Sequence, residues 1–225
     1  MEKLQRKVPE GGRTGLFGGT FNPIHNGHLR AAEEIRELLA LEQVLFIPSN
    51  NPPLKRDTTV AQAHHRFEMA RLAIAGNPAF ALSDIECRTN EVSYTINTIK
   101  EIMNSTSGSE LFFILGLDAF LEMPKWYKAE EILSGVALVV MSRPTVDKEK
   151  IWESPYIGAE DINGDSRQAI SIKRLKNGKS ITIAEITPIN ISSTKIRQLR
   201  GEGRTIKYLL PENVESYIIN HELYK

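Results

Sequence analysis

The sequence predicts an α/β fold: a Rossmann-like, doubly wound parallel sheet with helices on both faces and a C-terminal helical portion. From residue 13 to residue 143, short apolar runs alternate with amphipathic runs in the order β-α-β-α-β-α-β-α-β, which is typical of a parallel sheet. The run ELFFILG at 110–116 is almost continuously apolar, as expected of a strand buried on both faces. With 225 residues, 41% of them hydrophobic, the chain is long enough to bury one sizeable core.

Each element of this pattern has its own signal. The first strand, 13–19, is a short apolar run that ends in glycines, and the helix at 28–40 repeats Ala32, Ile35 and Leu39 at helical spacing. The other predicted elements, in chain order, are strand 43–49, loop 50–57, helix 60–76, strand 80–86, helix 93–104, strand 110–116, helix 129–133, strand 136–143, and helices 192–201 and 211–223. Ligands of such sheets bind outside the carboxyl ends of the strands, where the strand order reverses.

The chain after residue 143 departs from this alternation. Residues 145–180 are polar and weakly periodic, and apolar residues alternate on both sides of Asn177-Gly178, which favours a β-hairpin. We therefore expect a flexible tail at 1–12 and a single domain at 13–225, with 145–180 as an excursion that carries the hairpin.

The composition disfavours several classes of protein. The chain has 28 basic and 28 acidic residues and a formal net charge of zero, which argues against a general nucleic-acid or membrane-surface binder. No apolar run approaches the roughly 20 residues of a membrane span, the first residues lack a signal-peptide core, and Cys87 is the one cysteine. We expect a cytoplasmic protein without nucleic-acid or membrane partners, and the sequence leaves a homo-oligomer open.

A glycine loop follows the first strand. Gly18 and Gly19 carry no Cβ, so a ligand can approach the backbone closely there, and N–H groups between a strand and a helix can bind phosphate. The alternative is an ordinary tight turn, because the loop through Thr20 matches neither the dinucleotide fingerprint nor the P-loop.

Two histidines lie three residues apart directly after this loop. His28 stands in the first helical turn, where the helix dipole favours an anion, and His25 precedes the predicted N-cap, Asn26. Both imidazoles can face the volume above the first strand and bind phosphate. A core role is the alternative for His28, and no cysteine or nearby carboxylate completes a metal site. We interpret His64 and His65, which have no such loop, as structural.

The stretch ISSTKIR at 191–197 is the third candidate. Ser192, Ser193 and Thr194 are cap-type residues at a predicted helix start, and Arg197 follows in the first turns. Hydroxyls, N–H groups and a guanidinium at one helix start can hold a polyphosphate. An ordinary N-cap with a solvated basic face is the alternative.

These motifs together resemble one family. GGTFNPIHNGH at 18–28 is similar to the G-x-F-x-P-x-H-x-x-H signature of the nucleotidylyltransferase superfamily, and ISSTKIR is similar to its C-terminal signature. The stretches NPPLKR, HHRFEMARLA, SYTINTI and LGLDAFLEMPKWYKAEEI narrow the resemblance to the bacterial nicotinate-nucleotide adenylyltransferases. The resemblance covers about residues 13–220 of the chain.

The resemblance implies that ATP and nicotinate mononucleotide become deamido-NAD and pyrophosphate. The mononucleotide phosphate attacks the α-phosphate in line, so catalysis is positioning and charge stabilisation, and Mg²⁺ is held mainly by the triphosphate. The implied catalytic residues are His28, His25 and Arg197. The implied ATP-binding residues are Gly18, Gly19, Thr20, Phe21, His25, His28, Gly116, Asp118, Ile191, Ser192, Ser193 and Arg197. The implied mononucleotide-binding residues are Lys55, Tyr94, Thr95, Trp126 and Tyr127, and no protein-built metal site is implied.

Some of these implied roles have an open alternative. Trp126 is the expected plate for the pyridine ring, unless it is a partly exposed packing residue. The N–H groups of Tyr94 and Thr95 are the expected partners of the nicotinate carboxylate. Asp118 is expected on a ribose hydroxyl, unless it caps the next helix. The family's loop reads Pro-Pro-His-Lys, whereas this chain has Leu54 in place of the histidine, so that a phosphate-facing histidine is absent there.

Three other functions remain as alternatives. Two are adenylyl transfer to nicotinamide mononucleotide or to phosphopantetheine; the resemblance implies Thr in place of His25 in the phosphopantetheine enzyme. The third, from another class, is a non-catalytic nucleotide sensor on the same fold. The presence of both histidines and of Arg197 argues against a sensor.

Overall fold

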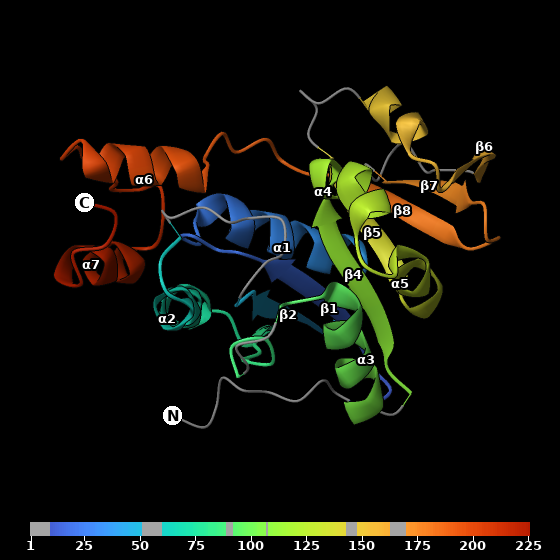
Figure 1. Cartoon of the computed structure of the whole chain (residues 1–225), viewed down its shortest axis with the longest axis horizontal. Coiled ribbons are helices and arrows are strands. Elements are labelled where there is room, and N and C mark those ends of the chain that lie inside the picture. The colour runs from blue at the N-terminus through green and yellow to red at the C-terminus, as the bar shows by residue number, and fades with distance from the viewer. Residues whose placement is uncertain (1–9, 51–59, 89–91, 107, 143–147, 163–169) are drawn as a thin grey trace.

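The computed structural model describes residues 10–50, 60–88, 92–106, 108–142, 148–162 and 170–225. Within these residues, eight strands form one sheet in the order β3-β2-β1-β4-β5-β8-β7-β6 (Figure 1). The strands are β1 (Arg13–Gly19), β2 (Gln43–Pro48), β3 (Phe80–Leu82), β4 (Glu110–Gly116), β5 (Ala137–Ser142), β6 (Ile157–Ile162), β7 (Ile170–Leu175) and β8 (Ser180–Glu185). Strands β1 to β5 and β8 pair in parallel, which confirms the predicted doubly wound parallel sheet.

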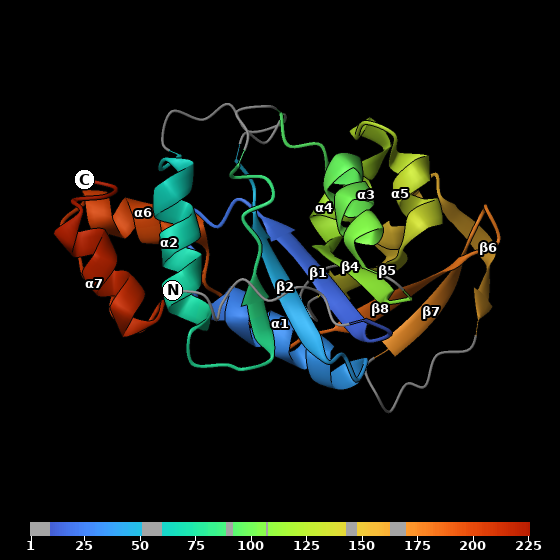
Figure 2. The same ribbon diagram turned by 90° about the horizontal axis from the view of Figure 1, so that it is seen from below.

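The helices cover both faces of the sheet. They are α1 (Asn26–Leu38), α2 (Ala63–Ile74), α3 (Thr95–Ser105), α4 (Leu117–Glu122), α5 (Ala129–Gly135), α6 (Ser193–Gly201) and α7 (Glu212–Asn220), with 3₁₀ turns at η1 (Met123–Lys125) and η2 (Lys148–Glu153). Figure 2 shows α3, α4 and α5 on one face of the sheet and α1 on the other, with α2, α6 and α7 gathered at one end. None of the helices in the described part of the chain is long and apolar enough to cross a membrane.

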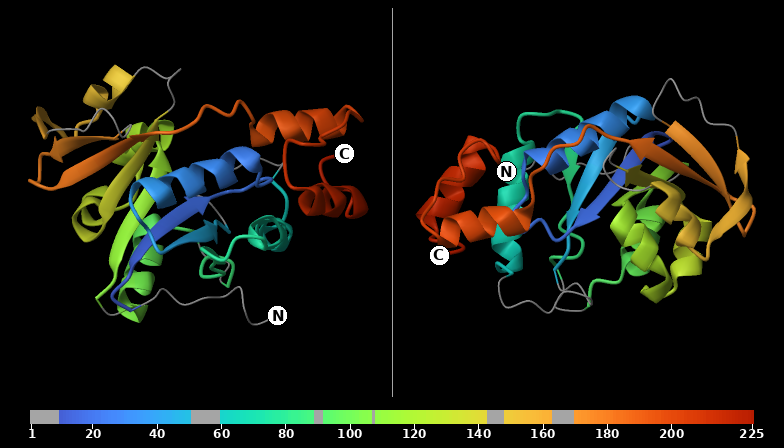
Figure 3. Two further views of the ribbon diagram at one scale, coloured as in Figure 1. Left: turned by 180° about the vertical axis from the view of Figure 1, so that it is seen from behind. Right: turned by 90° about the horizontal axis from the view of Figure 1, so that it is seen from above.

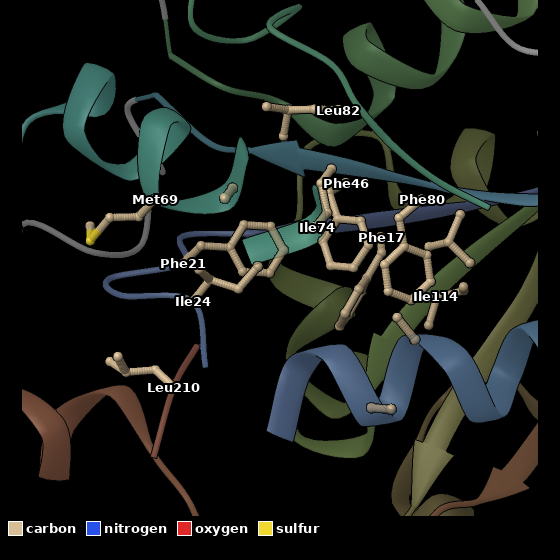
Figure 4. Close-up of a cluster of buried hydrophobic side chains, with 14 of the residues drawn as sticks. Phe17, Phe21, Ile24, Phe46, Met69, Ile74, Phe80, Leu82, Ile114 and Leu210 are labelled. Carbon is tan, nitrogen blue, oxygen red and sulfur yellow. The ribbon is translucent and has the colours of Figure 1, made fainter. Parts of the chain in front are cut away.

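Strand alternation divides the core into two layers. Successive side chains of a strand point to opposite faces, so Leu16 and Leu45 pack with α3, α4 and α5, whereas Phe17 and Phe46 pack with α1, α2, α6 and α7. The second layer contains an aromatic cluster in which the rings of Phe46 and Phe80 lie 5.0 Å apart (Figure 4). The rings of this cluster connect β1, β2 and β3 on one face of the sheet.

The far edge of the sheet is antiparallel. β7 pairs with β8 across a turn at Asn177-Gly178, where Gly178 has a φ of +84°, a conformation that glycine adopts without steric cost. β6 then pairs antiparallel with β7. These strands continue the main sheet beside β5, at the end opposite to the helices α6 and α7 (Figure 1).

Candidate active site

The site is built where the carboxyl ends of β1 and β4 lie side by side. The two strands are parallel neighbours, with Phe17 in register with Ile114, and they end at Gly19 and Gly116. The chain order of the strands reverses between them, because β2 and β3 lie on one side of β1 while β4 and β5 lie on the other. Such a point in an open α/β sheet is where ligands bind.

The absence of a side chain has a different consequence at each of the three glycines at this point. A Cβ built on Gly18 would meet only the Phe113 ring, at 3.9 Å, and one built on Gly116 would have no neighbour within 4 Å. A Cβ on Gly19 would lie 3.0 Å from the ring of Phe21, closer than normal packing allows. Gly18 and Gly116 therefore keep backbone open to a ligand, whereas Gly19 makes room for a core side chain.

Phe21 anchors the loop between β1 and α1. Its φ of +46° is in the left-handed region, which a bulky residue rarely adopts, and its side chain is 3% exposed. The ring packs edge-on against Phe17 with centroids 5.7 Å apart, and Figure 4 shows both rings within the aromatic cluster. The ring of Phe21 thus belongs to the core, and any contact with ATP falls to its backbone.

The two histidines stack on each other at the start of α1. The ring centroids of His25 and His28 are 3.7 Å apart and the rings are 26° from parallel. His25 is the N-cap of α1, so the prediction of Asn26 as N-cap was wrong by one residue; Asn26 is the first helical residue. The Asn26 N–H donates to the carbonyl of Leu209 at 3.1 Å, which ties the helix start to the segment before α7.

A hydrogen bond decides which nitrogen of His28 carries the proton. The backbone N–H of His25 donates to Nδ1 of His28 at 3.2 Å. Nδ1 must therefore be unprotonated, so the neutral ring carries its proton on Nε2 and presents an N–H donor there. Such a donor suits a phosphate oxygen, and the edge-on contact with Phe21, 5.2 Å between centroids, fixes the ring plane.

Helix α6 is attached to the same loop by two side chains. The Ser193 hydroxyl donates to the carbonyl of Pro23 at 2.8 Å, and Nη1 of Arg197 donates to the carbonyl of Asn22 at 2.9 Å. Ser192 is the N-cap of α6 and accepts from the N–H of Lys195. The hydroxyl of Ser193 thus donates within the protein, whereas the first N–H groups of a helix have no intrahelical acceptor and Arg197 has further N–H groups besides the one bonded to Asn22.

Asn22 connects this loop to two distant segments, and the sequence did not single it out. Its Oδ1 accepts from the N–H of Ala61 at 3.0 Å and from the hydroxyl of Tyr224 at 2.7 Å. Asn22 is 5% exposed, and burial raises the pKa of the Tyr224 hydroxyl. The left view of Figure 3 shows the C-terminal segment beside α6 and α7. Asn22 lies within the quoted motif, but nothing in the sequence reveals a contact with a residue 202 positions away.

Tyr94 and Trp126, which are predicted to bind the mononucleotide, pack against the core layer of α3, α4 and α5. The rings of Tyr94 and Tyr127 are 4.8 Å apart, and Trp126 packs edge-on against Phe113 at 6.3 Å, the same ring that lies nearest to Gly18. Tyr94 is the N-cap of α3, and its N–H donates to the carbonyl of Val92 at 3.0 Å. The Tyr94 N–H therefore has an acceptor within the protein, and its binding to a carboxylate stays a prediction. Thr95 is the first residue of α3.

Three further predicted residues are placed less directly. Asp118 is an exposed residue in the first turn of α4, whose N-cap is Gly116, so the alternative that Asp118 is the cap is wrong. Ile191 precedes α6, and its carbonyl lies 3.8 Å from a Cβ built on Gly27 at the start of α1. Lys55, like Leu54, lies outside the described residues.

Comparisons with known proteins bear on the chemistry of this site. The family model described as cytidylyltransferase-like matches residues 16–199. A curated protein of Geobacter metallireducens named "Probable nicotinate-nucleotide adenylyltransferase" is 42% identical over 215 residues, which cover 94% of this chain and 98% of that protein. A protein of the same name from Thermoanaerobacter sp. is 41% identical over 214 residues, which cover 95% of this chain and 94% of that protein.

Solved structures agree in fold. Plasmodium falciparum nicotinic acid mononucleotide adenylyltransferase complexed with NaAD aligns with a TM-score of 0.66 at 19% identity and covers 95% of this chain and 97% of that chain. The same enzyme complexed with APC aligns with a TM-score of 0.64 at 18% identity, with the same coverage of both chains. At these identities the likeness concerns the arrangement of helices and strands.

Proposed function

The chain belongs to the cytidylyltransferase-like family, and from this premise we propose that it transfers the adenylyl group of ATP to nicotinate mononucleotide, giving deamido-NAD and pyrophosphate in NAD biosynthesis. One observation of the structure supports this most strongly: a stacked histidine pair at the start of α1, beside the open backbone of Gly18, with the donor nitrogen of His28 assigned to Nε2. Neutral N–H donors at a helix start suit a triphosphate.

The reaction needs no nucleophile from the protein. An oxygen of the mononucleotide phosphate forms a bond to the α-phosphorus of ATP, and the bond from that phosphorus to the α,β-bridging oxygen breaks. The electron pair of that bond leaves with pyrophosphate. We assign to His28 the stabilisation of charge on the α-phosphate through Nε2–H, and to His25 the support of that ring by stacking.

Helix α6 is proposed to hold the part of ATP that leaves. The first N–H groups of a helix have no intrahelical acceptor, so those of Ser193 and Thr194 can bind the β- and γ-phosphates. Arg197 uses one N–H for the carbonyl of Asn22 and has four others for phosphate oxygens. Because α6 is attached to the loop through Ser193 and Arg197, both ends of the triphosphate would be held by one rigid unit.

Mg²⁺ is proposed to enter with ATP. The donors that the loop and α6 present are N–H groups, which bind anions, and within the described residues no group of three or more His, Cys, Asp or Glu side chains could hold a metal ion. The triphosphate and water would therefore supply the ligands of the ion, as is usual for magnesium. When bound, it neutralises phosphate charge.

The mononucleotide is proposed to bind across β4 from the loop. Trp126 and Tyr127 would face the pyridine ring, and the N–H groups in the first turn of α3, that of Thr95 among them, would bind its carboxylate. Asp118 would bind a ribose hydroxyl, and Lys55 would reach the phosphates. Small-molecule substrates and a single cysteine are compatible with the cytoplasm, which we propose as the location.

The proposed function is tested by pyrophosphate release from ATP and Mg²⁺ with three acceptors side by side: nicotinate mononucleotide, nicotinamide mononucleotide and phosphopantetheine. We expect nicotinate mononucleotide to have the highest kcat/KM, because N–H donors leave the NH₂ group of the amide unpaired. A higher value for either other acceptor contradicts the substrate assignment. ATP binding without release with any acceptor supports a sensor instead.

A further inference from the structure

One arginine of α2 is buried among apolar residues. Arg66 is 1% exposed and occupies the helical stripe that continues through Met69, Ala70 and Ile74, all of them buried. Burial lowers the pKa of its guanidinium. Among the described residues no carboxylate forms an ion pair with it, and burial raises the pKa of Glu86, a carboxyl whose charge acts on it. Burying a cation without an ion-pair partner destabilises the folded state, so other interactions must stabilise the buried guanidinium.

The compensation is a set of four hydrogen bonds to backbone carbonyls. Nη1 donates to Thr20 at 2.8 Å and also to Ser49, Nη2 donates to Asn50 at 2.9 Å, and Nε donates to Ala61 at 2.8 Å. These carbonyls come from three segments: the glycine loop after β1, the end of β2, and the residues before α2. A planar guanidinium with five donors can join them at once, whereas an ammonium group has three donors on one atom.

These bonds determine how the glycine loop faces a ligand. The N–H of Ser49 donates to the carbonyl of Gly19 at 2.9 Å, while the carbonyl of Ser49 accepts from Arg66, so both backbone polar groups of Ser49 are used to hold the loop. In a trans peptide the C=O and N–H groups point in opposite directions. Since the carbonyl of Thr20 points to Arg66, the N–H of Phe21 points away from it, and the orientation of that N–H depends on the guanidinium.

We propose that Arg66 is a positioning residue of the transfer site: its guanidinium fixes the loop of Gly18 to Phe21 against the end of β2, and thereby the position of the ATP triphosphate. The inference rests on the proposed function, because it concerns where phosphates bind. Arg66 does not touch the reacting atoms in this assignment. It acts through the peptide groups of the loop.

The test compares Arg66→Lys and Arg66→Met with the wild-type chain in pyrophosphate release and in ATP binding by calorimetry. A misplacement of about 1 Å costs up to ~100-fold in rate, so we expect kcat to fall about tenfold in Arg66→Lys and about 100-fold in Arg66→Met. The ATP Kd should rise in both variants, and the KM for nicotinate mononucleotide should change less than about threefold. If kcat falls in Arg66→Lys, which keeps the positive charge, then the planar guanidinium with its several donors is required and a buried charge alone is not sufficient.

Two controls separate positioning from loss of stability. Ile74→Ala removes a buried side chain from the far end of the same helix. Arg71→Met removes a partly exposed arginine of this helix that pairs with Glu68. If Ile74→Ala lowers the thermal midpoint as much as the Arg66 variants and lowers kcat equally, Arg66 is only structural and the inference is wrong. A folded Arg66→Lys variant with wild-type kcat and ATP Kd also contradicts it.

The same measurements keep the two proposals apart. If the wild-type chain releases pyrophosphate with nicotinate mononucleotide, the proposed function stands whatever the variants do. If it binds ATP but transfers nothing, the proposed function fails, and the ATP Kd of the Arg66 variants against that of Ile74→Ala still decides the inference. Should Arg66→Met not fold, Arg66→Lys, which keeps a long cation, provides the decisive comparison.

Discussion

The two halves of the candidate site are built by different forces. In the ATP half, which comprises residues 18–28 and α6, side-chain donors hold backbone carbonyls: the buried Arg66 and the partly buried Arg197 and Ser193 each bond to a carbonyl of the loop. In the mononucleotide half, which comprises Tyr94, Trp126 and Tyr127, the side chains contact other rings, and Tyr127 is 52% exposed. The first half is cross-linked by hydrogen bonds to its backbone, whereas the second half consists of aromatic side chains that are partly buried or exposed.

This difference matches the proposed work of each half. Displacement at phosphorus needs donors that are already oriented when charge develops, since reorganising them during the reaction raises the barrier. Holding a pyridine ring needs contact area, which aromatic side chains supply. We therefore expect changes in the ATP half to lower kcat and changes in the mononucleotide half to raise the KM for the mononucleotide.

The largest expected effect comes from His28→Ala. The variant removes the Nε2–H donor, and loss of one donor to a developing oxyanion costs about 100- to 1,000-fold in kcat. ATP should still bind, because the first N–H groups of α6 and the guanidinium of Arg197 are retained. The measurement is kcat from pyrophosphate release together with ATP Kd by calorimetry.

His64→Ala is the matched control, because His64 is an exposed histidine of α2 and has no place in the proposed chemistry. We expect its kcat to stay close to that of the wild-type chain. A His28→Ala variant with kcat near that of the His64→Ala control contradicts the role of His28. It also contradicts the view that the donors of the ATP half are already oriented when charge develops.

An intermediate effect is expected from Trp126→Ala. A stacked aromatic contact contributes about 0.5–1.5 kcal/mol beyond its buried area, so the KM for nicotinate mononucleotide should rise about 3- to 10-fold while the ATP Kd is unchanged. Trp152→Ala, at an exposed tryptophan of η2 whose ring lies under the ammonium of Lys173, is the control. If kcat falls more than the mononucleotide KM rises, the division of labour between the halves is wrong.

The sequence was sufficient for the strand, loop and helix at the start of the ATP half because these elements are local. The strand, loop and helix at 13–40 are consecutive, their periodicity is clear, and the motif GGTFNPIHNGH places every group of the loop in order. The same local pattern misled at one point, since Asn26 is the better cap former but His25 takes the cap. Local preference yields there to the stacking of His25 on His28.

Contacts between distant segments escaped prediction. Arg66 stands at a core position of α2, and an arginine on an apolar stripe is a signal of a buried polar contact, yet its carbonyl partners lie up to 46 residues away. The bond from Tyr224 to Asn22 crosses 202 positions. Without strand order and helix packing, no spacing rule connects such residues, so the supports of the loop appear only once the fold is assembled.

The smallest expected effect concerns pH and the junction of α2 with α7, which supports the ATP half. Nδ1 of His65 lies 2.9 Å from the hydroxyl of Tyr217, and the His65 ring centroid is 4.0 Å from that of His64 and 5.5 Å from that of His221. Burial lowers the pKa of His65 below its usual 6.5, and the charges of His64 and His221 lower it further. All five histidines of the chain lie in the ATP half, in α2 or after α7.

The sign of the pH effect follows from that lowered pKa. Between the folded pKa and 6.5 the unfolded chain binds more protons at His65 than the folded chain does, so folding stability is full above about pH 6.5 and declines as the pH falls through the folded pKa. We expect the thermal midpoint to drop between about pH 7.5 and pH 5.5, and to drop less in His65→Asn, which retains a hydrogen-bonding group for Tyr217 without titrating. Equal drops in both proteins show that His65 is not the titrating group. If the thermal midpoint drops and the KM for the mononucleotide rises while the ATP Kd stays unchanged, acid acts on the mononucleotide half of the site.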